Sequence, residues 1–204
     1  MSRALRPTVL TGLLSAAAVL GYVSYRLATQ GPAPEAEPAA STQPSQQLAD
    51  RLPDFSLDNL DGVPTPIASW PDKPMLINFW ATWCAPCLRE IPLLKDFQGA
   101  NDAVQVVGIA VDRRDPVLSF AEEMDFNYPV LVGQSEAMDA AAAFGVSVFA
   151  LPFTVFTDPS GAILGVHTGE IHSEHLDELL AILKDLDAGR IDRDLARTRI
   201  ADEM

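Results

Sequence analysis

The chain has 204 residues, of which 48% are hydrophobic, so it is long enough for one domain with appendages and for a sizeable core. Its formal net charge is −14 at pH 7, and an acidic surface of this kind repels a phosphate backbone, so no nucleic acid is expected as a partner. The acidity otherwise predicts a soluble, self-repelling surface and identifies no substrate.

An uncharged apolar run near the N-terminus occupies residues 8–25 and reads TVLTGLLSAAAVLGYVSY. Its length is about what a helix needs to cross a bilayer. Arg3 and Arg6 precede the run and Arg26 follows it, which favours a cytoplasmic N-terminus, residues 1–7, with the remaining chain outside the cytoplasm. We therefore expect a transmembrane helix that serves as an anchor, with a cleaved secretory signal or a buried soluble helix as the alternatives.

A stretch rich in proline and alanine, residues 26–50, follows this run. It shows no hydrophobic periodicity and predicts a semi-extended linker, because such a composition cannot bury enough apolar surface to fold. Residues 51–188 carry the regular patterns of a folded domain. The charged residues 189–204 form a tail, which we expect to be a solvated extension, at most a frayed helix.

Strand and helix patterns alternate in the folded region. Short apolar runs rich in branched residues predict buried strands, and amphipathic segments between them predict helices. The predicted strands are 53–57, 75–80, 104–111, 128–132, 153–157 and 163–168. The predicted helices are 86–97, 115–124, 135–144 and 173–186, with Pro92 kinking the first and Ser173 capping the last. This order implies an α/β fold in which a central mixed sheet is flanked by helices on both faces.

The two cysteines of the chain, Cys84 and Cys87, lie two residues apart between a predicted strand and a predicted helix. A C-x-x-C at such a turn indicates thiol–disulfide redox chemistry, because the helix N-terminus stabilises the first thiolate and the second thiol can resolve a mixed disulfide. A zinc site would need further cysteine or paired histidine ligands, and an inert bridge over so short a loop would stabilise little. We expect neither a metal nor a cofactor.

Four motifs carry a resemblance to a known family. Residues 78–87 read NFWATWCAPC, Glu90 lies three residues after the second cysteine, residues 151–154 read LPFT, and residues 158–161 read DPSG. With the preceding anchor and linker, these motifs resemble the membrane-anchored, thioredoxin-like disulfide reductases of the TlpA/ResA type, close to the CcmG/DsbE branch. The resemblance covers residues 53–186 and implies a thioredoxin-like three-layer fold.

The resemblance also implies roles for the motif residues. Cys84 is the expected nucleophile at an exposed turn and Cys87 the buried resolving thiol, so the pair forms the redox disulfide. Glu90 is the expected acid–base group, because a buried carboxylate with a raised pKa can accept a thiol proton near neutral pH. The expected substrate-binding residues are Trp83, Pro86, Leu151 and Pro152.

The loop around Pro152 both matches and departs from the family pattern. Its preceding peptide bond is expected to be cis, which would expose backbone beside Cys84 for pairing with an extended substrate segment. Phe153 stands where relatives commonly carry Thr or Glu, and the CcmG-type glycine before the proline is absent. These departures put the substrate preference in question and leave the client unspecified.

Together these features predict a thiol–disulfide oxidoreductase in the bacterial inner membrane, single-pass, with its catalytic domain in the periplasm. The resemblance implies that it reduces disulfides of exported proteins, such as apocytochrome c or copper-centre proteins, and that a membrane thiol donor of the DsbD/CcdA type re-reduces it. A copper-handling chaperone that uses the same thiols and a disulfide-forming oxidant are the alternatives. His167, His172 and His175 are expected to be solvated surface residues rather than metal ligands.

Overall fold

The computed structural model describes residue 25, residues 48–146 and residues 150–203. Apart from Tyr25, the expected N-terminal segment and anchor, and most of the expected linker, therefore lie outside the described residues. Among the residues that are described, no helix combines the length and the hydropathy needed to cross a membrane.

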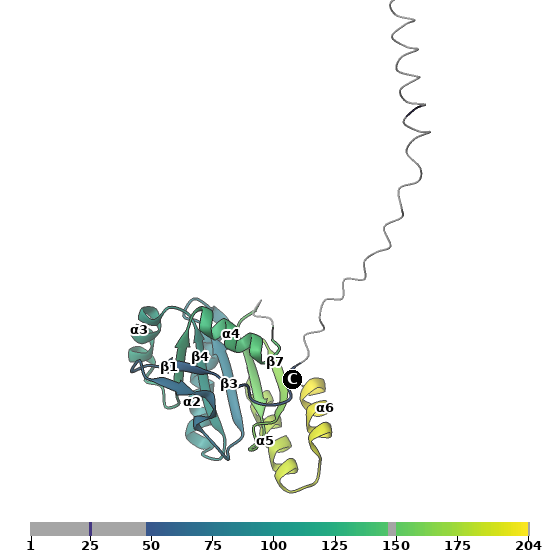
Figure 1. Ribbon diagram of the computed structural model, residues 1–204. Helices are drawn as coiled ribbons and strands as arrows, with labels where there is room; N and C mark the ends of the chain where they lie inside the picture. The colour runs from purple at the N-terminus through teal and green to yellow at the C-terminus, as the bar shows by residue number, and fades with distance from the viewer. Residues whose placement is uncertain (1–24, 26–47, 147–149, 204) are drawn as a thin grey trace, which may run out of the picture. The chain divides into compact units, whose positions relative to one another are not determined.

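Within the described ranges, seven strands form one mixed sheet in the order β2-β1-β5-β4-β3-β6-β7 (Figure 1). The strands are β1 (Ser56–Asn59), β2 (Pro64–Pro66), β3 (Met75–Trp80), β4 (Gln105–Val111), β5 (Val130–Gly133), β6 (Phe153–Thr157) and β7 (Ile163–Thr168). β3 pairs in parallel with β4 and antiparallel with β6. This register places Asn78 of β3 between Gly108 and Thr154, so a row of small or polar residues crosses the middle of the sheet.

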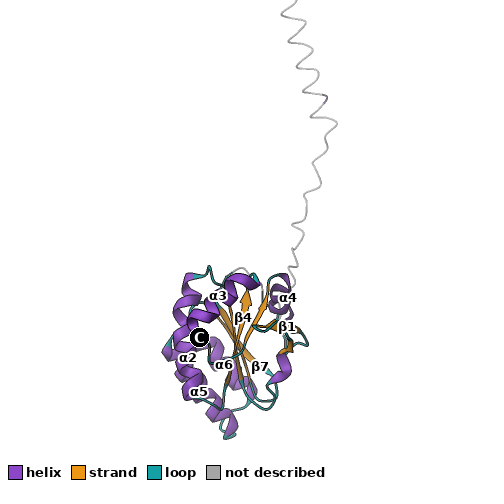
Figure 2. Cartoon of the chain, turned by 90° about the vertical axis from the view of Figure 1, so that its left-hand side faces the viewer, coloured by secondary structure: helices purple, strands orange, loops and turns teal. Residues whose placement is uncertain are grey.

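Helices cover both faces of the sheet (Figure 2). They are η1, a 3-10 helix (Ile67–Ser69), α2 (Ala85–Ala100), α3 (Arg114–Met124), α4 (Ser135–Ala143), α5 (Ser173–Asp187) and α6 (Arg193–Glu203). Buried side chains of α2, α3, α5 and α6 join one hydrophobic core, and those of α4 and η1 join a second core. The predicted α/β fold with a central mixed sheet is therefore confirmed.

Side chains that alternate along β3 contribute to both cores. Leu76 and Trp80 belong to the core under α2, whereas Ile77 and Phe79 belong to the core under α4. All six residues of β3 are buried, as expected for a central strand with helices on both faces. Because the chain passes within a few residues from this buried strand into α2, the intervening turn is held on both sides by packed elements.

Some predicted element boundaries were wrong. β3, β6 and β7 have the predicted bounds, but α2 continues past Phe97 to Ala100, with Pro92 inside it. Ser173 does not cap α5; the N-cap is His172, whose backbone N–H donates a hydrogen bond to Nδ1 of His175 at 3.1 Å. The imidazole of His175, at the third helical position, accepts the N–H of the N-cap residue as a Glu or Gln does in a capping box, so the usual N-cap residue types were a misleading signal here.

The expectation of a solvated C-terminal tail was also wrong. Residues 193–203 form α6, in which Ala196 and Ile200 are buried. A Cβ atom on Gly165 of β7 would lie 2.3 Å from Cγ2 of Ile200, so the helix packs where the strand has no side chain. Arg197 Nε donates to the Ile163 carbonyl of the same edge strand at 2.9 Å. Two buried apolar residues on a largely charged helix were too weak a pattern to predict this packing.

We expect Ile200→Ala to lower the free energy of unfolding by about 2–4 kcal/mol, because it deletes a buried side chain and leaves a cavity against β7. The measurement is chemical denaturation of the oxidised protein. Leu195→Ala on the same helix is the control, because Leu195 is 47% exposed and its truncation should change stability by less than about 0.5 kcal/mol. Equal stability of the two variants would show that α6 does not dock on β7 in solution.

Candidate active site

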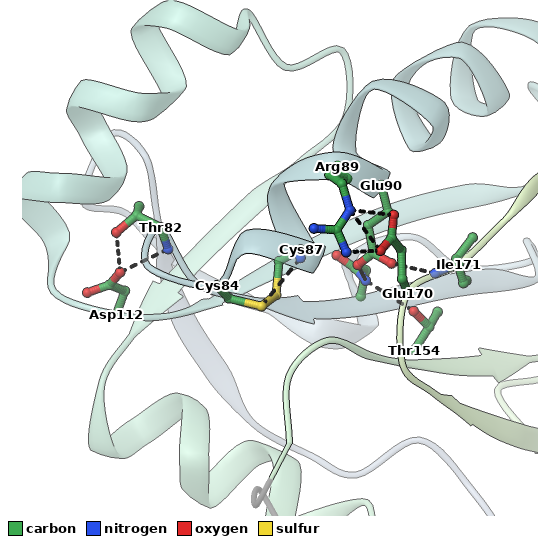
Figure 3. Close-up of a disulfide and its surroundings, with 10 residues drawn as sticks. Thr82, Cys84, Cys87, Arg89, Glu90, Asp112, Thr154, Glu170 and Ile171 are labelled. Carbon is green, nitrogen blue, oxygen red and sulfur yellow. Dashed lines mark hydrogen bonds and ion pairs between the residues drawn. A yellow bond between two sulfur atoms is a disulfide. The ribbon is translucent and has the colours of Figure 1, made fainter.

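A disulfide joins Cys84 and Cys87 at the start of α2, directly after the turn that follows β3 (Figure 3). Cys84 is the N-cap of the helix, and the backbone N–H of Cys87 donates to Cys84 Sγ at 3.3 Å. In this oxidised state Cys84 is only 5% exposed and Cys87 is fully buried, so Cys84 lies deeper than the exposed turn that was expected. The neighbouring Trp83 is 70% exposed.

The turn before the disulfide is held by Asp112, the residue that directly follows β4. Its Oδ2 accepts hydrogen bonds from the backbone N–H and the hydroxyl of Thr82, at 3.0 and 2.5 Å (Figure 3). Its Oδ1 accepts the N–H of Arg113 at 2.7 Å. Sequence reasoning missed Asp112. A usable signal existed, because the carboxyl ends of adjacent parallel strands lie at the same edge of a sheet, and Asp112 directly follows the strand beside β3.

Glu90, on the first turns of α2, is buried behind the disulfide with 1% exposure. Its Oε1 accepts from Asn78 Nδ2 and its Oε2 accepts from the backbone N–H of Ile171, both at 2.7 Å (Figure 3). Burial raises the pKa of this carboxyl from 4.5 to about 7, although both hydrogen bonds act in the opposite direction. A carboxyl with this pKa can both accept and release a proton near neutral pH.

Asn78 ties Glu90 to the strand that follows the proline loop. The same Nδ2 that bonds Glu90 also donates to Thr154 Oγ1 of β6 at 3.1 Å, and both residues are fully buried. Asn78 stands in the middle of β3, where an amide provides a donor to the carboxylate but no titrating group. Glu90 is therefore the ionisable group of this buried cluster.

The peptide bond between Leu151 and Pro152 is cis, as the resemblance predicted. Leu151 is half-buried and Pro152 is buried, and Pro86 between the cysteines is half-buried. Phe153 is fully buried and stacks on Phe79 with ring centroids 4.4 Å apart. The bulky residue that departs from the family pattern is therefore part of the core under α4, and its side chain does not reach a substrate surface.

Of the three histidines expected at the solvated surface, His172 is exposed and His175 is half-buried, but His167 is buried. His167 is 6% exposed, and its Nε2 lies 3.2 Å from the Glu170 carbonyl oxygen. The His167 and His175 rings lie 4.4 Å apart, and the His172 and His175 rings 5.6 Å. Despite this proximity, no group of three or more His, Cys, Asp or Glu residues in the described part of the chain has an arrangement that could hold a metal ion.

A disulfide at the N-terminus of a helix that follows the central strand of a mixed sheet, with a cis-proline loop before a neighbouring strand, defines a thiol–disulfide oxidoreductase of thioredoxin-like fold. The chain belongs to the AhpC/TSA family, whose pattern matches residues 48–166.

Named relatives agree with this class. The chain is 31% identical over 139 residues to the thioredoxin-like protein YneN of Bacillus subtilis, across 66% of this chain and 79% of that protein. It is 30% identical over 135 residues to the thiol-disulfide oxidoreductase ResA of Geobacillus thermodenitrificans, across 65% and 75% of the two chains.

Two solved structures are similar as well. The structure of MTB DsbF in its mixed oxidized and reduced forms has a TM-score of 0.58 at 27% identity, covering 67% of this chain and 99% of that one. A secreted thiol-disulfide isomerase from Corynebacterium glutamicum has a TM-score of 0.58 at 25% identity, covering 66% and 85%.

We expect the oxidised protein to lose stability as the pH rises from about 4.5 to above 7. In this window folded Glu90 holds a proton that the unfolded chain has released, so the folded state binds more protons and the free energy of unfolding falls. Across the whole window the free energy of unfolding should fall by about 3 kcal/mol through this group. The measurement compares the protein with Glu90→Gln in denaturant titrations at each pH. A pH dependence that is the same in Glu90→Gln would assign it to other groups.

Proposed function

We propose that this protein is a reductase of disulfides in exported proteins, with Cys84 as nucleophile, Cys87 as resolving thiol and Glu90 as proton acceptor. The observation that carries the proposal is the placement of a buried carboxyl with a pKa of about 7 on the same helix as Cys87, one turn further along. A purely structural disulfide would not need a titrating group buried behind it.

The first step of the proposed reaction is attack by the Cys84 thiolate on one sulfur of the client disulfide. The client S–S bond breaks, a mixed disulfide forms, and the second client sulfur leaves as a thiolate. The N-terminus of α2 favours the attacking thiolate, because its unpaired N–H groups and dipole stabilise negative charge; the Cys87 N–H already points at Cys84 Sγ.

The second step is resolution by Cys87. Glu90 accepts the Cys87 thiol proton, the resulting thiolate attacks Cys84 Sγ, and the client leaves fully reduced as the Cys84–Cys87 disulfide forms. Two electrons pass to the client, and a thiol donor must return them before the next cycle. A membrane thiol protein of the DsbD/CcdA type is the donor that we propose.

Client recognition is proposed to use the surface around the disulfide. Trp83 is 70% exposed beside Cys84 and can pack against an extended segment, with Pro86 and Leu151 as further half-buried apolar surface. Backbone at Leu151 and Pro152 is proposed to pair with the client main chain. The client class, exported proteins such as apocytochrome c or copper-centre proteins, stays a proposal.

For the cellular arrangement we propose residues 1–7 in the cytoplasm, a helix over 8–25 in the inner membrane, a linker over 26–50 and a periplasmic domain over 51–188. The uncharged run with its arginine flank supports this order. The similar protein from Corynebacterium glutamicum is described as a secreted thiol-disulfide isomerase, which fits a role outside the cytoplasm.

We expect Cys87→Ser to accumulate a mixed disulfide with its client in cells, because the resolving thiol is gone while the nucleophile remains. The measurement is non-reducing electrophoresis of the captured protein, with release by a reductant. Cys84→Ser is the matched control and should capture nothing, since Cys87 is fully buried. If both variants capture equally, Cys84 is not the nucleophile.

The direction of electron flow is tested by the reduction potential of the Cys84–Cys87 pair. A reductant should have a potential near that of thioredoxin, about −270 mV, measured by equilibration with glutathione or thioredoxin. A potential near about −120 mV would mark a disulfide-forming oxidant and overturn the proposed direction. Stoichiometric copper on the purified protein would instead favour the chaperone alternative.

A further inference from the structure

The loop between β7 and α5, residues 169–172, delivers a backbone donor to the active site. The N–H of Ile171 donates to Glu90 Oε2 at 2.7 Å, and the Ile171 side chain is 1% exposed in the core under α2. At its other end the loop is tied to the proline loop, because the Gly169 N–H donates to the Pro152 carbonyl at 2.9 Å. This loop therefore contacts both the acid–base candidate and the candidate substrate backbone.

Glu170, in the middle of this loop, pairs with Arg89. Arg89 Nε donates to both Glu170 carboxylate oxygens, at 3.1 and 3.0 Å, and Nη2 donates to Oε2 as well (Figure 3). The arrangement is a two-pronged contact, the geometry in which a partly exposed ion pair contributes more than the usual surface pair. Arg89 directly precedes Glu90 in α2, so the pair joins the helical turn that carries Glu90 to the loop that carries Ile171.

We propose that Arg89 is a positioning residue for Glu90: its ion pair with Glu170 holds the Ile171 N–H on the Glu90 carboxylate and so sets how readily Glu90 accepts the Cys87 proton. The functional half of this proposal, that Arg89 sets how readily Glu90 accepts the Cys87 proton, rests on the proposed role of Glu90. The geometric half, that the ion pair holds the Ile171 N–H on the Glu90 carboxylate, does not. Nothing in the sequence motifs singled out Arg89 or Glu170, because the two residues are 81 positions apart.

Loss of Arg89 acts on Glu90 in one direction. The Ile171 N–H lowers the pKa of Glu90, whereas the nearby Glu170 charge raises it. Without Arg89 the loop loses its side-chain tie to α2 and the Glu170 charge loses its counter-charge, so both changes favour protonated Glu90.

The other groups that face Glu90 leave this direction unchanged. Asn78 and Thr154 are neutral, and Tyr128 stays protonated because burial, and then the Glu90 charge, raise its pKa. Cys87 is held in the disulfide of the oxidised protein. His167 contacts the Glu170 backbone carbonyl, which is a second anchor of the same loop and not a contact with the carboxylate of Glu90.

The test uses Arg89→Met in the oxidised, full-length protein, with carboxyl-carbon NMR to titrate Glu90 and amide exchange to follow Ile171. We expect the Glu90 midpoint to rise by about 0.5 unit, roughly a threefold change in proton affinity, and the Ile171 amide to exchange faster. The Glu90 midpoint of Arg89→Lys should fall between those of the unchanged protein and Arg89→Met, since an ammonium keeps the charge but not the two-pronged contact. An unchanged midpoint, or a raised midpoint with unchanged Ile171 exchange, would overturn the positioning role.

Arg190→Met is the matched control, because Arg190 also forms an exposed ion pair, with Asp185, on the far end of α5. It should leave both the Glu90 midpoint and the Ile171 exchange rate at their original values. Neither readout needs a client, so a failure here is distinguishable from a failure of the capture experiment. The functional half is tested by the pH midpoint of client reduction, which should rise with the Glu90 midpoint; a fixed midpoint would overturn that half.

Discussion

Burial of the Glu90 carboxyl is the constraint on which the active site depends. A buried carboxylate without hydrogen bonds is costly, so its oxygens must be satisfied by groups brought from elsewhere in the chain. Asn78 of β3 and the backbone of Ile171 meet this need from positions 12 and 81 residues away. The requirement therefore joins the central strand, the helix of the disulfide and the loop before α5 into one unit.

The sheet around this unit explains why the disulfide turn is well supported. β3 is buried on both faces, and the turn that leaves it is tied sideways to β4 through Asp112 and Thr82. The far edge of the sheet is protected as well. Arg51, near the start of the folded domain, pairs with Ala162, and α6 packs along β7, so this edge strand does not present an open row of backbone groups.

Phe153 is the residue next to the cis proline at which this chain departs from the family pattern. A bulky residue after the cis proline suggested an altered substrate preference, yet the side chain stacks on Phe79 inside the core. Although Phe153 differs from the family pattern next to a functional loop, its side chain is thus accommodated in the core. The site residues that lie where solvent or a client can reach them are instead the exposed Trp83 and the Arg89–Glu170 pair.

The sequence by itself determined the central strand, the cysteine pair and the α/β order, because an unbroken apolar run, a short motif and alternating periodicity are local signals. The resemblance added Glu90 and the cis peptide bond before Pro152. Only the tertiary structure placed Ile171 and Asp112 at the active site and packed α6 on β7. Their contacts with Glu90, Thr82 and Gly165 join residues at least 30 positions apart, and no local pattern encodes which distant backbone group will satisfy a buried charge or fill a gap beside a glycine.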